Sequence, residues 1–483
     1  NEYRAREVLE KYCSFMPIPI FLNNEKAEPQ YETIEKDELT DKDTIIETIV
    51  EPAKTEEKEN EKGEKETVET EPAREKYKIL KRPVALNDTT PLWSKHPNEC
   101  TDEEYRDFYR KVFHDYKEPL FWIHLNMDYP FNLKGILYFP KINTEYDSIE
   151  GTIKLYNNQV FIADNIKEVI PEFLMLLKGA IDCPDLPLNV SRSALQNDGF
   201  VKKISDYITK KVADKLSGMC KTDRENYEKY WDDIAPFIKF GCIKDEKFAE
   251  KMNDYILFKN LDGKYLTLKD CLEENKEKHE NTVFYVTDEK EQSQYINMFK
   301  KEGLDAVILP HSIDSPFIGH LEQKNEGLKF LRIDADLNST FKEEVKDDDE
   351  EFKKTSETLT ETFKKALGND KLEIKVEKLK DESISSMLTV SEETRRMQDM
   401  MKMYNMYGMD PSMFGGAGET LVLNANNKLV QYVLNHGEGE NTKKICEQLY
   451  DLALLAHGSL SPERMTGFVA RTNEIMMMLA EAK

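Results

Sequence analysis

The chain has 483 residues, of which 39% are hydrophobic and 33% charged, and its mean hydropathy is −0.66. This length exceeds what one hydrophobic core usually organises and predicts about three domains. The net charge of −25 excludes nucleic acid as a main partner, because phosphate contacts require basic surface. The longest apolar runs are far shorter than the roughly 18 residues of a membrane span, and no signal peptide is visible, so no membrane partner is expected.

Seven cysteines are scattered along the chain, with no CxxC pair and no histidine at ligand spacing. They are Cys13, Cys100, Cys183, Cys220, Cys242, Cys271 and Cys446. This distribution is typical of reduced thiols in a reducing compartment, so we expect a cytoplasmic protein without a metal site.

The first 24 residues predict a helix from Tyr3 that Pro17 stops, followed by an extended piece up to Phe21. Because the chain begins at Asn1 inside this helix, we expect it to be a fragment of a longer protein. Residues 25–75 hold 19 acidic and 8 basic side chains. Such a segment has too little to bury, so it predicts a flexible acidic linker, with a partner-binding tail as the alternative.

Folded character resumes at Leu86. The alternation of apolar and polar residues over 121–127 predicts a strand, and Asn157 with Asn158 predicts a hairpin turn between strands at 153–156 and 159–162. Apolar residues between Phe200 and Leu216 recur at helical spacing. These patterns predict an α/β domain.

A second α/β unit follows, because strand-like 283–286, helix-like 291–301 and strand-like 306–309 form a βαβ pattern. Residues 330–333 could add a strand to this predicted parallel sheet. The alternation over 372–376 then opens an α+β unit that ends in two helices. The fold class is therefore predicted as multidomain α/β and α+β.

No glycine-rich phosphate loop is present, and the best chemical candidate is the run LPLNVSRSALQN, residues 186–197. Ser191 can cap a helix there, and Arg192 and Gln196 lie four residues apart on one face near its N-terminus. A fixed guanidinium and an amide at this place suit an oxyanion or a phosphate. The alternative is an ordinary loop arginine in a surface ion pair.

The two C-terminal helices carry apolar stripes. We expect Ser461 to cap the second helix and Pro462 to begin it. Two short apolar helices at a chain end need a partner, which predicts a homodimer. The candidate dimerisation residues are Ile445, Leu449, Leu452, Phe468, Ile475 and Leu479.

Four runs resemble the bacterial HtpG branch of the ninety-kilodalton heat-shock chaperone family. They are NDTTPLW (87–93), TDEEYRDFY (101–109), FLMLLKGAIDCPDLPLNVSRSALQ (173–196) and DLALLAHGSL (451–460). The resemblance implies a remnant of the N-terminal ATPase domain at 1–24, the linker at 25–80 and a middle domain in two α/β parts, 81–225 and 226–345. It also implies a C-terminal dimerisation domain at 346–483 that ends in a helix bundle, and that nearly all of the ATPase domain is missing.

The same resemblance implies catalytic residues. In the family an arginine of the middle domain reaches the γ-phosphate of ATP, and the matching residues here are Arg192, with Gln196 and Asn189 in support. The family usually has Glu after this arginine, where this chain has Ser193. ATP and Mg²⁺ are expected in the full-length protein, whereas this fragment should bind neither and should not hydrolyse ATP.

A methionine-rich stretch ending at Met413 is implied to contact unfolded client proteins, because adaptable thioethers suit variable apolar surfaces. Trp93 and Trp122 are further candidates. For all of these side chains, packing in a core is the alternative. The client-binding candidates are Trp93, Trp122, Met397, Met400, Met401 and Tyr404.

The function predicted from the sequence is a homodimeric molecular chaperone for non-native clients, coupled to ATP hydrolysis in the full-length protein. The alternative is an ATP-independent holdase or scaffold dimer that naturally lacks the ATPase domain.

Overall fold

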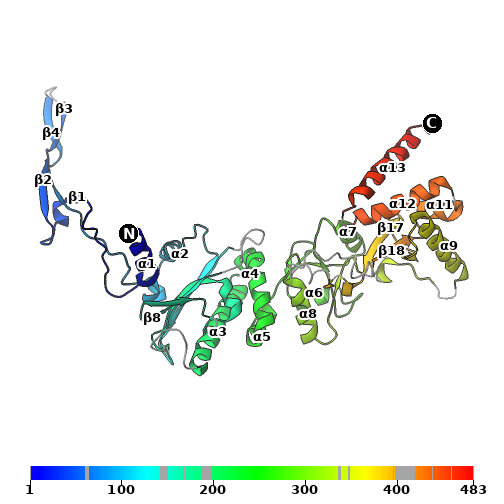
Figure 1. Ribbon diagram of the computed structural model, residues 1–483, viewed down its shortest axis with the longest axis horizontal. Helices are drawn as coiled ribbons and strands as arrows, with labels where there is room; N and C mark the ends of the chain where they lie inside the picture. Colours follow the sequence, from blue (N-terminus) through cyan, green and yellow to red (C-terminus); the bar gives the residue numbers. More distant parts are fainter. Residues whose placement is uncertain are drawn as a thin grey trace. The chain divides into compact units, whose positions relative to one another are not determined.

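The computed structural model describes residues 2–59, 65–141, 151–166, 169–186, 198–335, 339–345, 349–394, 396–397, 419–437, 439–457 and 459–481. The chain divides into two compact units, which are described separately (Figure 1). Unit 1 comprises Asn1–Pro171 and Met175–Ile208, and unit 2 comprises Glu172–Leu174 and Thr209–Lys483.

Unit 1 opens with α1 (Glu2–Cys13), so the predicted first helix is confirmed and ends four residues before Pro17. The predicted acidic linker, by contrast, contains strands. An antiparallel sheet has the order β1-β5-β2, and β3 and β4 form a separate antiparallel pair. The strands are β1 (Tyr31–Glu35), β2 (Ile45–Glu51), β3 (Lys54–Glu59), β4 (Lys65–Glu71) and β5 (Arg74–Leu80).

The prediction of a linker without ordered elements is therefore wrong for this segment. β2 is rich in β-branched residues, which favour strands, and Lys76 Nζ of β5 lies 2.9 Å from Glu51 Oε1 of β2. Arg82 holds Asp43 through a bidentate contact, with its Nε 2.8 Å from Oδ1. Yet Ile79 is the only buried hydrophobic side chain among the described residues of this sheet, so backbone pairing and surface charges carry its order.

The main sheet of unit 1 has the order β6-β7-β10-β8-β9, with β10 parallel to β8 and antiparallel to β7. The predicted strand at 121–127 and the predicted hairpin are confirmed. The turn lies one residue later than predicted, at Asn158 and Gln159, which both adopt positive φ. The strands are β6 (Phe121–Met127), β7 (Leu133–Phe139), β8 (Ile153–Asn157), β9 (Val160–Asp164) and β10 (Lys178–Asp182).

Helix α2 (Asp102–Phe113) begins at a capping box in which Thr101 and Glu104 bind each other's backbone N–H groups. Its buried face, Tyr105, Phe108 and Tyr109, packs in one core with side chains of β7 and β10. The long helix α3 (Asp198–Thr222) contains the predicted helix at 200–216.

Unit 2 contains helices α4 (Arg224–Lys244) and α5 (Glu246–Met252) and a sheet of order β12-β11-β14-β13-β15. The predicted βαβ pattern is confirmed, because β13 pairs in parallel with both β14 and β15. β11 pairs antiparallel with β14, so the sheet is mixed. The elements are β11 (Phe258–Asn260), β12 (Tyr265–Leu266), α6 (Leu268–Glu274), β13 (Thr282–Val286), α7 (Ser293–Lys301), β14 (Val307–Ile308), α8 (Asp314–Lys324) and β15 (Lys329–Arg332).

The C-terminal part of unit 2 has the predicted α+β character. A sheet of order β16-β18-β17 shares a core with α9, α11 and α12. The elements are α9 (Glu350–Leu367), β16 (Glu373–Glu377), β17 (Ser386–Val390), β18 (Glu419–Asn424), α11 (Lys428–His436), α12 (Glu440–Leu455) and α13 (Pro462–Glu481).

Short 3-10 helices complete the described secondary structure. They are Lys36–Glu38, Leu92–Ser94, Pro97–Glu99, Glu172–Leu176, Asn253–Tyr255 and Ser339–Phe341. Among the helices of the described ranges, none combines the length and the hydropathy that crossing a bilayer demands. All seven cysteines are free thiols.

Candidate functional site

The loop that the sequence predicts to bind an oxyanion or a phosphate, with Arg192, Gln196 and Asn189, lies outside the described residues. Both of its ends are described. β10 ends at Asp182, and α3 begins at Asp198. Near the start of the loop Asp185 accepts the backbone N–H of Asn132 at 2.7 Å, so the chain leaves the sheet from a fixed position.

Asp182 anchors this strand end from inside unit 1. Its carboxylate accepts the backbone N–H of Gln159 at 2.9 Å and the indole N–H of Trp93 at 3.4 Å. Burial raises the pKa of Asp182, although these hydrogen bonds oppose the shift. Burial also raises the pKa of the neighbouring Cys183 thiol to about 12, so this thiol stays protonated. The pair therefore acts as a structural anchor, and Cys183 does not supply a nucleophile.

Trp93, a predicted client contact, is 1% exposed. Its ring packs edge-on against Phe15 at 4.7 Å between centroids and against Phe108 at 5.8 Å. The prediction is wrong for this residue, because aromatic neighbours cover the surface that a client would need. The alternative of a core tryptophan is correct.

Trp122 differs from Trp93, because it is only half-buried. It stacks on Tyr105 at 5.0 Å between centroids, and the Arg106 guanidinium lies 5.9 Å from its ring centroid. Its role as a client contact stays a prediction.

The methionine-rich stretch begins at Met397, whose side chain is 49% exposed. Met400, Met401 and Tyr404 lie outside the described residues, so their roles also stay predictions. Arg396 fixes the start of the stretch, since its guanidinium contacts both carboxylate oxygens of Glu322 on α8, at 2.6 and 3.0 Å. The same guanidinium donates to Glu392 at 2.8 Å. Burial opposes the charged form of Arg396, but the hydrogen bonds to these two carboxylates outweigh it and raise the pKa of Arg396.

The predicted dimerisation residues fall into two classes. Leu449 is 1% exposed and packs in the same core as Leu359 and Phe363 of α9, and the half-buried Ile445 packs against that core. The prediction that Leu449 faces another chain is therefore wrong, because α9 and β17 already cover this side of α12. Ile445 also packs against this core with part of its side chain, so it has little surface left for contact with another chain.

The other four predicted dimerisation residues lie nearer the surface. Leu452 is 44% exposed and Leu479 is 71% exposed, whereas Phe468 and Ile475 are half-buried. α13 also exposes apolar side chains that were not predicted as dimerisation residues, and the whole described helix contains no buried residue. These side chains are Met465, Val469, Met476, Met477 and Met478. We call the exposed apolar residues of α13 together with Leu452 the α13 face.

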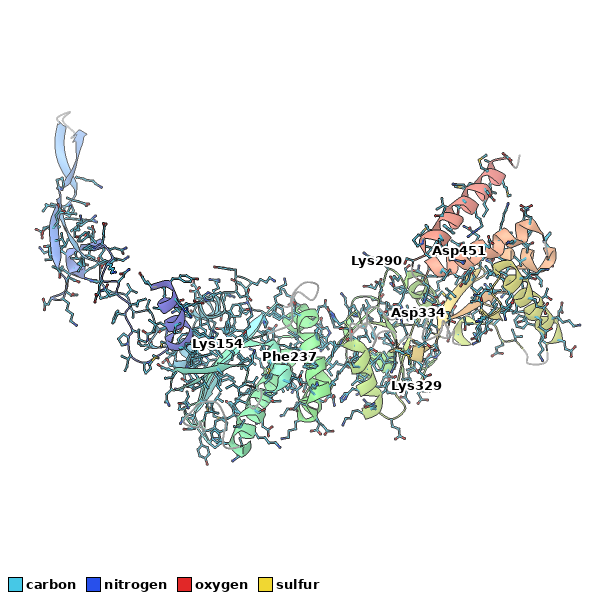
Figure 2. All side chains as sticks on the ribbon, viewed as in Figure 1. Lys154, Phe237, Lys290, Lys329, Asp334 and Asp451 are labelled. Carbon is cyan, nitrogen blue, oxygen red and sulfur yellow. The ribbon has the colours of Figure 1, made fainter. Side chains whose placement is uncertain are left out.

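A buried carboxylate, that of Asp451, joins the two terminal helices. Asp451 is labelled in Figure 2. Asp451 of α12 is 1% exposed and accepts two hydrogen bonds from Arg464, at 2.6 and 2.9 Å, and one from Arg471. Arg464 and Arg471 are seven residues apart, which places them on one face of α13. The spacing of the two arginines was the sequence signal that could have indicated a shared acidic partner. The burial of Asp451 itself cannot be recognised from its position in the sequence.

Among the residues that the structure describes, no group of histidine, cysteine or acidic side chains has the arrangement of a metal site. Of the sequence-predicted site residues that the structure describes, those that offer apolar surface to another molecule are Met397 and the exposed residues of the α13 face.

Comparison with known proteins gives one family. The sequence profile described as "Hsp90 protein" matches residues 1–482. The chain is similar to "Chaperone protein HtpG" of Bacteroides thetaiotaomicron, with 38% identity over 451 residues, 91% of this chain and 59% of the relative. It is 38% identical to the HtpG of Porphyromonas gingivalis over 75% of this chain and 54% of the relative. The HtpG of Borrelia garinii is 29% identical over 99% of this chain and 70% of its own length. The chain thus spans about three fifths of the length of the Bacteroides relative.

Proposed function

Because the chain belongs to the Hsp90 family, we propose that it functions as a molecular chaperone that binds unfolded or non-native client proteins. Two copies pair through their terminal helices, and the pair holds its clients as a clamp. The domains follow the predicted division, with middle α/β domains at 81–225 and 226–345 and a dimerisation domain at 346–483.

The observation that carries this proposal is the combination of family membership with exposed apolar side chains on a strongly acidic chain. A surface with a net charge of −25 keeps the chaperone dispersed. Against this background, the exposed methionines at Met397 and on the α13 face are the places where an apolar segment of another chain can bind.

Coupling to ATP is the finer part of the proposal. It rests on Arg192, with Gln196 and Asn189 beside it, at the family position of the residue that reaches the γ-phosphate. A guanidinium at this place would stabilise the charge that builds on the transferring phosphoryl group while Mg²⁺ bridges the phosphate oxygens. The alternative is a holdase or scaffold that works without ATP, and the dependence of client binding on ATP distinguishes the two.

Client binding is tested by diluting chemically denatured citrate synthase into buffer and following light scattering. The chain should suppress scattering when present in equimolar amount. Met397→Ser should weaken the suppression, whereas Leu429→Ser should not, although Leu429 on α11 is 48% exposed and thus matches Met397 in exposure. Scattering equal to that of citrate synthase alone would contradict the proposal. In the whole protein, client binding that responds to ATP supports the coupled function, and binding that ignores ATP supports the holdase.

A further inference from the structure

The sheet of β11 to β15 contains a topological switch point. β13 connects through α7 to β14 on one side, and β14 connects through α8 to β15 on the other side of β13. Since such parallel crossovers are right-handed, α7 and α8 lie on opposite faces of the sheet, and Figure 1 shows them apart. The loops that follow β13 and β14 therefore diverge at the carboxyl edge, which is where open α/β sheets bind small ligands.

A cavity of about 490 Å³ lies at this carboxyl edge. Its size is within the usual range of small-molecule sites. Thr287 to Lys290 of the loop after β13 and Leu309 to His311 of the loop after β14 line it. α4 contributes Trp231 and Lys239. Apolar walls and charged groups thus meet at the position that the topology predicts.

The cavity includes a buried cation. Lys239 is 3% exposed, and its ammonium forms an ion pair with Asp314 at the start of α8. The second oxygen of Asp314 accepts the backbone N–H of His311 at 2.9 Å. An ammonium has three donors, and within the described part of the chain Asp314 is its one hydrogen-bond acceptor. The ammonium also lies 5.8 Å from the centroid of the Phe317 ring, and Lys239 lines the cavity beside these two partners.

Further charges on the lining are of both signs. Lys259 and Lys290 are cations, and Asp232 and Glu289 are anions. None of these four takes part in an ion pair with another described residue. Asp288 also lines the cavity, but its carboxylate accepts the backbone N–H groups of Lys290 and Glu291, at 2.8 and 3.0 Å.

This balance decides the class of ligand. Three lysines and three acidic residues line the cavity, so a phosphate or a polyamine would meet as much repulsion as attraction. A zwitterion can place its carboxylate near the lysines and its ammonium near Asp232 and Glu289. We propose that this cavity binds a free amino acid with an apolar side chain, which Leu257, Ile308 and Leu309 would accommodate.

The test titrates the full chain with L-leucine and follows the heat of binding and tryptophan fluorescence, because Trp231 lines the cavity. Leucine should bind, whereas N-acetyl-L-leucine and L-leucinamide, which each lack one charge, should bind at least about tenfold more weakly, the loss expected for one charged contact. Lys290→Gln and Asp232→Asn, both at exposed positions, should each weaken leucine binding by a similar factor.

Lys329→Gln is the matched control. Lys329 is an exposed lysine of the same sheet, but it begins β15 and so lies at the amino edge, and Figure 2 shows it on the other side of this region from Lys290. The Lys329→Gln variant should bind leucine as tightly as the unmodified chain does. The proposal is overturned if leucine at about 10 mM, a concentration far above the dissociation constant of a specific site, changes neither the heat signal nor the tryptophan fluorescence. It is also overturned if either analogue binds as tightly as leucine, or if Lys329→Gln weakens binding as much as Lys290→Gln.

Discussion

Individual buried polar side chains hold the sheet of unit 1 to its covering helix. Tyr105 of α2 and His124 of β6 share a hydrogen bond of 2.7 Å between the hydroxyl and Nδ1. Burial lowers the pKa of His124 from its ordinary value of 6.5. The folded state therefore favours the neutral imidazole, which makes this contact sensitive to pH.

The sign of this effect gives a prediction. As the pH falls through about 6.5, the unfolded chain takes up a proton at His124 before the folded chain does, so stability present above this pH is lost below it. His124→Gln should reduce the drop in the urea midpoint of unit 1 between about pH 7 and about pH 5.5. His114→Asn serves as control and should keep the full drop, because His114 at the end of α2 is not among the groups that shift the pKa of His124, and Asn tolerates its left-handed backbone. An unchanged drop in His124→Gln would show that other groups cause it.

In the full-length protein, the proposed role of Arg192 in ATP hydrolysis can be tested by substitution. Arg192→Ala should lower ATP turnover by roughly 10² to 10³ and leave ATP affinity nearly unchanged, because the charge that it stabilises develops only in the transition state. Steady-state hydrolysis and equilibrium binding of ATP measure the two quantities. Turnover within about twofold of wild type would remove Arg192 from the mechanism, and the departure at Ser193, where the family has Glu, would be the next position to test.

At the scale of elements, the two terminal helices depend on Asp451. Its carboxylate is buried between Arg464 and Arg471, so removing it leaves Arg471, which is 16% exposed, with Glu447 as its one remaining ion-pair partner among the described residues. Asp451→Ala should destabilise the docking of α13 by about 3 kcal/mol, the usual cost of breaking a buried ion pair. Hydrogen exchange of α13 amides should become faster while α9 stays protected.

A matched control is the exposed ion pair between Lys444 and Glu474, whose charged atoms are 3.0 Å apart. Glu474→Ala should leave the exchange of α13 nearly unchanged, because water screens such pairs. Equal exchange in the Asp451 and Glu474 variants would mean that apolar packing alone holds α13.

The sequence predicted those elements whose side chains follow a strict period. β6, α3 and β16 were located from apolar spacing, because one of their faces packs on a core, whereas β13 was located from a continuous apolar run that is buried on both faces. The sheet of β1, β2 and β5 was not, since its residues are mostly exposed and its order comes from pairing between residues that lie 23 (Glu51 with Arg74) to 49 (Tyr31 with Leu80) positions apart in the sequence.

The candidate site was harder to predict than the fold. An apolar stripe does not say which neighbour covers it, so Leu449 and Trp93 could not be distinguished from Leu452 and Trp122. Contacts between distant segments, such as Arg396 with Glu322, leave no local pattern at all. These assignments required the tertiary structure.

For the whole molecule, the central claim is that two copies pair through the α13 face. Leaving its large apolar side chains in water costs about 1.5 to 3 kcal/mol each, and a second copy related by a two-fold axis can cover them. Truncating the chain before Thr442 is not a suitable test of this pairing. It would remove Cys446 and Leu449 from a core that α9 also needs.

The most direct measurement is therefore sedimentation equilibrium with substitutions at exposed positions. Met476 is 53% and Leu479 is 71% exposed, so replacing both with Glu should leave each subunit folded. The unmodified chain should sediment as a dimer at micromolar concentration, the variant Met476→Glu with Leu479→Glu as a monomer, and the control Leu429→Glu as a dimer. An unmodified chain that sediments as a monomer, or a double variant that remains a dimer, would contradict pairing through the α13 face.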